Sequence, residues 1–275
     1  MKLRLVILAA ICAAALAVPA GARADNSPAY YVALGDSLAT GAQPARSGEL
    51  NGLHAANGTN RGYVDDLYAA ERARVPNLQL RNFGCGGEST QTMINGGTFG
   101  DVRCGYKTSS QLDQAVAFLQ AHRGQLAFIT IDIGAGDLIS GGGVPAIAAN
   151  LPVILDRLRD AAGPDVPIAG MNYYDPFLAP AWFSAHDLTA LHADVSNDVA
   201  VDGFFDSLYA AAGDPDADVL TAFATADLTI QPDGLPLNVA RICQWTWMCS
   251  AGDIHANDAG YAVIAEAFEQ LHVLP

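Results

Sequence analysis

The sequence predicts an α/β protein, built as a three-layer α/β/α sandwich around a central, mostly parallel sheet. Short apolar runs with β-branched and aromatic residues alternate along the chain with longer, helix-like stretches. This alternation is typical of a parallel sheet that helices cover on both faces. The predicted strands are 30–34, 78–83, 126–133, 166–171 and 218–223.

Helices are predicted between these strands, at 62–74, 110–122, 144–162, 188–212 and 259–271. Asn257 or Asp258 is placed to cap the last of them. The segment 227–252 has little periodicity and contains Pro232 and Pro236, so we expect a long surface excursion there. Ligands of such sheets bind at the carboxyl ends of the strands, where functional loops are expected to converge.

Residues 1–24 have the pattern of a secretory signal peptide. Lys2 and Arg4 precede an apolar stretch, and Ala22-Arg23-Ala24 supplies the small residues that a signal peptidase recognises. The apolar stretch is shorter than the roughly 20 residues that cross a bilayer, so no stable membrane insertion is expected. We therefore expect a secreted protein in which residues 25–275 form a single domain.

The chain is acidic, with 14 Lys and Arg against 29 Asp and Glu and a formal net charge of −15. Removal of the leader would take Lys2, Arg4 and Arg23 with it and leave 11 basic against 29 acidic residues, a net charge of −18. This charge disfavours nucleic acid and anionic membrane surfaces as partners. We expect a monomer.

Four cysteines remain after the leader, an even number that favours disulfides in an oxidising compartment. Of the three possible pairings we predict Cys85–Cys104 with Cys243–Cys249, because each closes a short local loop. A structural zinc site is the alternative, but the close cysteine pairs that such sites use are missing.

Two segments at opposite ends of the chain carry candidate chemistry. Ser37 lies in Gly35-Asp36-Ser37-Leu38, directly after the first predicted strand. A serine hydroxyl needs a base to take its proton, and His255 precedes the last predicted helix, on a loop that can reach back across the sheet edge. Together they suggest nucleophilic catalysis.

These segments resemble the SGNH hydrolase superfamily, the GDSL esterases and lipases, over essentially the whole mature chain. The resemblance implies the SGNH, flavodoxin-like sandwich and a carboxylic ester hydrolase that uses Ser37 as nucleophile and His255 as base. It places the oxyanion hole at the backbone N–H groups of Ser37 and Gly87, the latter in the second family block, 82–89. The segment Cys243 to Cys249 also looks like the actinobacterial secreted branch of the family.

Two departures from the family pattern stand out. In the third block, normally Gly-x-Asn-Asp, Gly136 replaces the asparagine whose amide would join the oxyanion hole. Loss of one such donor costs about 2.7–4 kcal/mol elsewhere, so turnover could be low. The family aspartate stands three residues before the histidine, whereas Asp253 stands two before, so either Asp253 or the Gly252 carbonyl orients His255.

Other interpretations stay open. Asp132 and Asp137 could suggest a metal or a glycosidase pair, although Asp137 fits better as a brace of the turn after its strand. Trp245 and Trp247 either line an acyl pocket or pack against the disulfide. No metal or organic cofactor is implied, and the substrate is expected to be a small-molecule or lipid ester. The rival functions are a weakened SGNH-fold secreted binding protein and a carbohydrate acetyl esterase.

Overall fold

The sheet has five strands, all parallel. The computed structural model describes residues 27–44, 61–97, 106, 109–140 and 142–272, so the predicted leader lies outside the described residues. The strand order is β2-β1-β3-β4-β5. The strands are β1 (Ala29–Gly35), β2 (Leu78–Asn82), β3 (Leu126–Asp132), β4 (Ile168–Met171) and β5 (Asp216–Ala217). The predicted α/β sandwich is confirmed.

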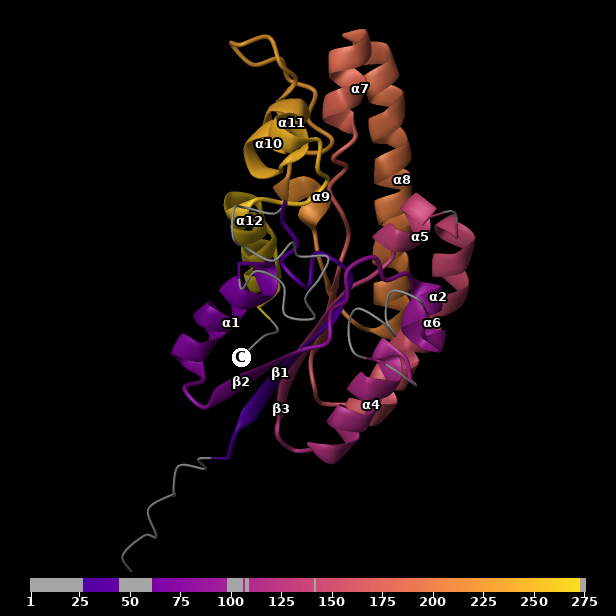
Figure 1. Cartoon of the computed structure of the whole chain (residues 1–275), viewed down its shortest axis with the longest axis vertical. Helices are drawn as coiled ribbons and strands as arrows, with labels where there is room; N and C mark the ends of the chain where they lie inside the picture. Colours follow the sequence, from indigo (N-terminus) through magenta and orange to yellow (C-terminus); the bar gives the residue numbers. More distant parts are fainter. Residues whose placement is uncertain (1–26, 45–60, 98–105, 107–108, 141, 273–275) are drawn as a thin grey trace, which may run out of the picture.

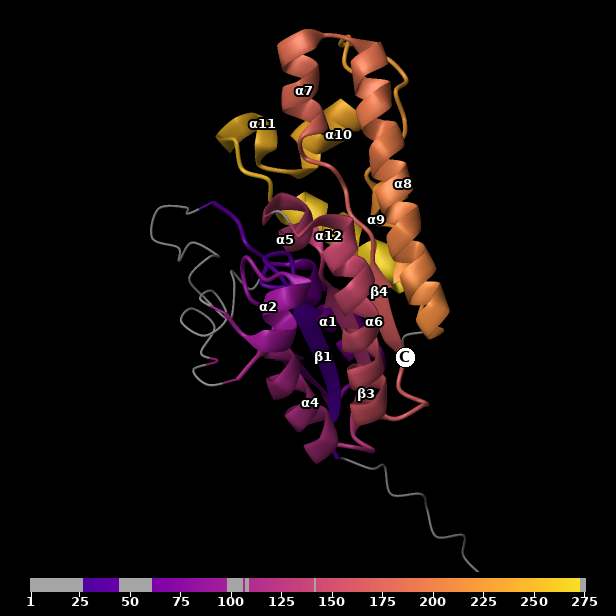
Figure 2. The ribbon, with the colours of Figure 1, turned by 90° about the vertical axis from the view of Figure 1, so that its right-hand side faces the viewer.

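Helices cover both faces of the sheet (Figure 1). On one face lie α1 (Tyr63–Arg74) and α12 (Asp258–Glu269). On the other lie α4 (Gln111–Ala121), α6 (Gly143–Ala162) and α8 (Leu188–Ala212), with α2 (Thr90–Asn95) against α6; Figure 2 shows this face. The five predicted helices are confirmed to within two residues at each end.

Short helices gather beyond the carboxyl ends of the strands, at the upper end of the molecule in Figure 1. They are α5 (Ala135–Ser140), α7 (Leu178–Ala185), α9 (Val219–Ala222), α10 (Leu237–Trp245) and α11 (Met248–Ala251). The loops after β1, β2 and β3 emerge at the same edge. This edge therefore holds the candidate site.

Two sequence predictions are wrong. The run 218–223 is helix α9, and the fifth strand is only Asp216–Ala217, just before it. The Asp218 side chain accepts a hydrogen bond from Thr221 N–H and caps that helix, which a run of six residues, four of them apolar, does not reveal. The segment 227–252 is likewise not a plain surface excursion, because α10 buries Val239 and Ile242 in the core.

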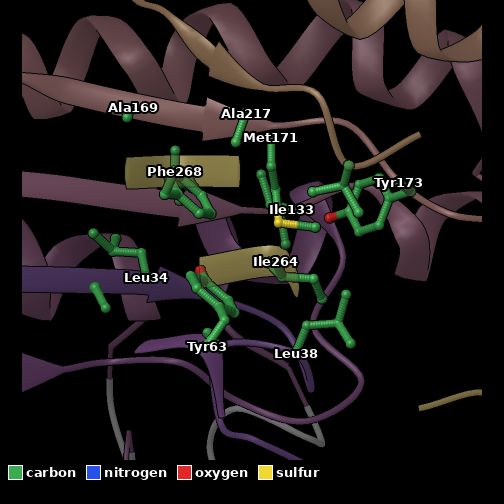
Figure 3. Close-up of a cluster of buried hydrophobic side chains, with 14 of the residues drawn as sticks. Leu34, Leu38, Tyr63, Ile133, Ala169, Met171, Tyr173, Ala217, Ile264 and Phe268 are labelled. Carbon is green, nitrogen blue, oxygen red and sulfur yellow. The ribbon is translucent and has the colours of Figure 1, made fainter. Parts of the chain in front are cut away.

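The central strands are buried on both faces. Residues 31–35 of β1 and 128–132 of β3 are all buried, as the continuous apolar runs predict. Figure 3 shows the core between the sheet and α12, where Ile264 and Phe268 lie against Leu34, Met171 and Tyr63. The Tyr63 and Phe268 rings stack, with centroids 5.1 Å apart. This packing fixes α12, and with it the loop that carries His255.

The Cys243–Cys249 disulfide is confirmed; it joins the end of α10 to α11, with the Cα atoms 5.0 Å apart. Cys104 lies outside the described residues, so Cys85–Cys104 stays a prediction. Within the described part of the chain, no helix combines the length and apolarity that a bilayer crossing requires.

An acidic row runs along α8. Asp194, Asp198, Asp202 and Asp206 recur every fourth residue, a spacing that puts them on one side of the helix. Burial, followed by the charge of Asp175, raises the pKa of Asp198 to about 8. Burial raises the pKa of Asp202 to about 7, although the Tyr173 N–H hydrogen bond to its carboxyl opposes that rise. These groups keep protons that isolated aspartates would lose.

The acidic row makes stability depend on pH. In the folded protein the pKa values of Asp198 and Asp202 lie above the ordinary value near 4. At pH values between the ordinary and the raised pKa, the folded protein therefore binds more protons than the unfolded chain. The free energy of unfolding should fall as pH rises from about 4 to about 8. We expect a higher Tm at pH of about 5.5 than at about 8.5, and a smaller difference in Asp198→Asn, whose amide carries no charge. A Tm that increases toward pH 8.5 in scanning calorimetry would contradict this.

Candidate active site

Ser37 lies in the turn that leaves β1, at the carboxyl edge of the sheet. The turn is closed by its own backbone, because the Ser37 carbonyl accepts the Ala42 N–H at 2.9 Å and the Thr40 hydroxyl at 2.8 Å. Ser37 is half-buried among buried neighbours. Among the described residues, neither its N–H nor its hydroxyl has a hydrogen-bond partner. Both groups are therefore available to a substrate.

Asp132, a buried residue at the end of β3, holds this turn in place by hydrogen bonds. Asp132 Oδ2 accepts the Ala39 N–H at 3.2 Å, and the Asp132 carbonyl accepts the Asp36 N–H at 3.1 Å. Tyr63 donates its hydroxyl to Asp132 Oδ1 at 2.6 Å. Since Asp132 is fully buried and surrounded by donors, its role here is to fix the turn.

Asp36 and Asp132 form a buried pair of carboxyls. Burial raises the pKa of Asp36, against the Leu38 N–H hydrogen bond to its Oδ1. Burial, and then the charge of Asp36, holds the pKa of Asp132 well above its usual range. The pair therefore keeps a proton at higher pH than two separate carboxyls would. This limits the negative charge next to Ser37.

His255 is almost buried and is held by Asp253. Asp253 Oδ1 lies 2.7 Å from His255 Nδ1 and also accepts the His255 backbone N–H at 2.9 Å. Gly252 ends α11 in the left-handed region, with φ of 65°, and the chain then turns Asp253 back onto the residue two positions later. Burial acts to raise the pKa of Asp253, but the hydrogen bonds from His255 outweigh it and hold that pKa below its usual range. The Gly252 carbonyl has no hydrogen bond to the imidazole.

Side-chain contacts join the histidine loop to the serine turn. Gln43 donates to Asp258 Oδ1 at 2.8 Å and accepts the Trp247 indole N–H at 3.1 Å. Tyr261 donates its hydroxyl to the Ala42 carbonyl at 2.6 Å. Residues more than 200 positions apart are thereby held side by side.

His255 lies close enough to Asp36, the residue before Ser37, for its charge to act on the Asp36 carboxyl and favour the ionised form. The structure thus brings the predicted serine and histidine segments to one place. No hydrogen bond joins the Ser37 hydroxyl to the imidazole in the described residues, and such contacts often tighten only when substrate binds.

The second block lies beside the serine turn. The Cys85 N–H donates to the Gly35 carbonyl at 3.0 Å, so this block starts from the last residue of β1. Gly87 is exposed, and its N–H makes no hydrogen bond to another described residue. It is a free backbone donor at the site edge.

Comparison with known proteins gives the family. The model of the GDSL-like lipase/acylhydrolase family matches residues 33–263, most of the chain. The chain belongs to the GDSL-like lipase/acylhydrolase family. It is therefore a GDSL-type acylhydrolase, a hydrolase of carboxylic esters. Curated protein sequences gave no match.

Two solved structures are similar in fold. A putative GDSL-like lipase from Parabacteroides merdae is 14% identical, with a TM-score of 0.55 over 88% of this chain and 94% of that chain. The native aryl esterase of M. smegmatis is 16% identical, with a TM-score of 0.54 over 90% and 100% of the two chains. At these identities the likeness supports the fold alone.

The structure gives a steric reason for Gly136. A Cβ at this position would lie 2.2 Å from the Glu88 carbonyl oxygen, far inside van der Waals contact. The start of α5 thus packs directly on the backbone of the second block. Asp137 completes this contact, because its carboxyl accepts the Thr90 N–H at 2.7 Å and the Thr90 hydroxyl at 2.8 Å. Asp137 is therefore a brace, but its carboxyl holds the start of α2 and not the turn after its own strand.

Several polar residues lie around the site although the sequence did not indicate them. Gln111 and Tyr173 contact Gly35 and Asp36, and Gln43, just after the serine turn, contacts Asp258. Asp132 gave a signal, as a carboxyl that ends an apolar strand, whereas nothing in the sequence marks the glutamines. Trp245 packs edge-on to Phe223, with centroids 5.3 Å apart, and Trp247 donates its indole N–H to Gln43.

A side chain at position 136 should therefore lower ester turnover rather than restore it. We expect Gly136→Asn, which supplies the family amide, to lower both Tm and ester turnover, because the Cβ displaces the Glu88 carbonyl. Gly203→Ala is the matched control: a Cβ there meets nothing within 4 Å, and alanine favours a helix by about 1 kcal/mol, so Tm should rise. Increased turnover in Gly136→Asn would contradict this explanation.

Proposed function

We propose that the chain is a secreted serine esterase that works through an acyl-enzyme, with Ser37 as nucleophile, His255 as general base and Asp253 as the group that orients the base. The contact between Asp253 and Nδ1 carries the proposal. With Nδ1–H donated to the carboxylate, Nε2 is the ring nitrogen left to accept the serine proton.

The reaction follows from this arrangement. His255 Nε2 takes the proton of the Ser37 hydroxyl as Oγ attacks the ester carbonyl. The resulting imidazolium, stabilised by Asp253, gives the proton to the departing alcohol. Water then attacks the acyl carbon with His255 again as base, the bond between that carbon and Ser37 Oγ breaks, and the imidazolium returns its proton to Oγ as the acid leaves.

The oxyanion would be held by the backbone N–H groups of Ser37 and Gly87. Both lack partners among the described residues, so neither must break a protein hydrogen bond before it donates to the anion. Prepositioned donors of this kind supply a large share of the rate in acyl transfer. The proposal uses no metal or organic cofactor.

Secretion rests on the leader pattern of residues 1–24 and on the disulfide in 243–249, the segment similar to the actinobacterial secreted branch. N-terminal sequencing of the exported protein tests it, and Asp25 is the expected first residue.

Substitutions at the proposed triad test the mechanism. We expect Ser37→Ala to abolish hydrolysis of p-nitrophenyl esters and covalent labelling by a fluorophosphonate, since the attacking oxygen is gone. We expect Asp253→Asn to lower kcat by up to about 10⁴-fold, because the amide favours the wrong tautomer of His255. Full activity or labelling in Ser37→Ala would refute the nucleophile.

A panel of substrates decides the ester class. Short- and long-chain lipid esters and acetylated sugars share the same chemistry at the carbonyl, and activity confined to the sugars would identify a carbohydrate acetyl esterase.

A further inference from the structure

Gln111 joins the strand before Ser37 to the second block. It is the first residue of α4 and, like Glu88, is completely buried. Its Oε1 accepts the Gly35 N–H at 2.8 Å, and its Nε2 donates to the Gly35 carbonyl at 2.9 Å. The same Nε2 donates to Glu88 Oε2 at 3.1 Å. One side chain therefore binds both backbone groups of Gly35 and a carboxylate of the neighbouring block.

Gly87 sits inside the loop that these contacts close. The Cys85 N–H donates to the Gly35 carbonyl at 3.0 Å, and the Glu88 N–H donates to the Cys85 carbonyl at 3.2 Å. The segment from Cys85 to Glu88 is thus attached to β1 at its start by the backbone and at its end through Gln111. The position of the Gly87 N–H relative to the serine turn depends on both attachments.

We propose that Gln111 is a positioning residue, which sets the separation of the Ser37 and Gly87 N–H groups through Gly35 on one side and Glu88 on the other. The inference rests on the proposed function, because it assigns those two groups to the oxyanion. In this chain Gly136 offers no side-chain amide, so the two backbone donors carry more of the stabilisation and their spacing matters more.

The contact between Gln111 and Glu88 can be tested by exchanging which side chain carries the charge. The two Nε2 hydrogens of Gln111 serve two acceptors, the Gly35 carbonyl and Glu88 Oε2. In Gln111→Glu both acceptors lose the Nε2 donor, so that the Gly35 carbonyl keeps only the Cys85 N–H and two buried carboxyls face each other. In Glu88→Gln, by contrast, the new side-chain carbonyl can still accept from Gln111. In the double variant the new amide at position 88 can donate to the new carboxylate at position 111, so the pair again has a donor and an acceptor.

The experiment compares ester hydrolysis by the wild type, Gln111→Glu, Glu88→Gln and the double variant, on the full chain. We expect Gln111→Glu to lower kcat about 100-fold, the effect of losing one oxyanion donor, with KM nearly unchanged because Gln111 contacts no substrate. Glu88→Gln should stay within a few-fold of wild type. The double variant should recover at least about tenfold of the lost kcat.

Tyr68→Phe is the matched control for stability. The Tyr68 hydroxyl donates to the Leu78 carbonyl at 3.2 Å, and Leu78 is the first residue of β2, at the end of the strand opposite to the site. Its loss removes a partly buried hydrogen bond and should lower Tm without changing kcat. If Gln111→Glu does not fold, Gln111→Asn takes its place, since the shorter side chain keeps an amide but cannot span both acceptors.

The outcomes separate the inference from the proposed function. An active wild type labelled at Ser37, combined with unchanged kcat in the Gln111 variant, overturns the inference alone. So does a double variant that recovers Tm but no kcat. A wild type that neither hydrolyses esters nor reacts at Ser37 overturns the proposed function and this inference with it.

Discussion

The active-site edge depends on a buried carboxyl at the end of a central strand. Asp132 accepts the Ala39 N–H, the Tyr63 hydroxyl and, through its carbonyl, the Asp36 N–H. A turn that leaves a parallel strand exposes backbone N–H groups that must find partners. One residue on the neighbouring strand satisfies two of them, the Asp36 and Ala39 N–H groups, and so holds the turn in place. Within the described part of the chain, the Ser37 and Gly87 N–H groups have no protein partner.

The fold brings the remaining parts to this turn from distant positions in the chain. Gln43 and Tyr261 fasten the loop before α12, while Gln111 fastens the second block. Each contact is a hydrogen bond between buried or partly buried groups, where a missing partner costs more than the bond itself gains. The site is therefore assembled by mutually dependent polar contacts.

The sequence predicts what depends on periodicity and on residue type. Alternating apolar runs and helical stretches gave the sheet and its five long helices, and the Asn257 side chain caps α12 by accepting the Ala259 and Gly260 N–H groups. The short run at 218–223 was misassigned, because six residues with four apolar side chains fit a strand or a helix equally well. Asp253 illustrates a different limit: its reach to the imidazole depends on a left-handed Gly252, which spacing alone does not reveal. Gln111 could not have been found, since its partners lie 76 and 23 positions away.

The central claim is that the Ser37 hydroxyl, the His255 imidazole and the two backbone donors meet around one reacting carbonyl. The most direct measurement is a crystal structure of the protein after reaction with a phosphonate ester, whose phosphoryl oxygen imitates the oxyanion. The account predicts phosphorus bonded to Ser37 Oγ, its oxygen about 2.7–3.1 Å from the Ser37 and Gly87 nitrogens, and His255 Nε2 within hydrogen-bond distance of Oγ. A phosphonate bound at another residue, or an imidazole that remains apart from Oγ in that adduct, would contradict it.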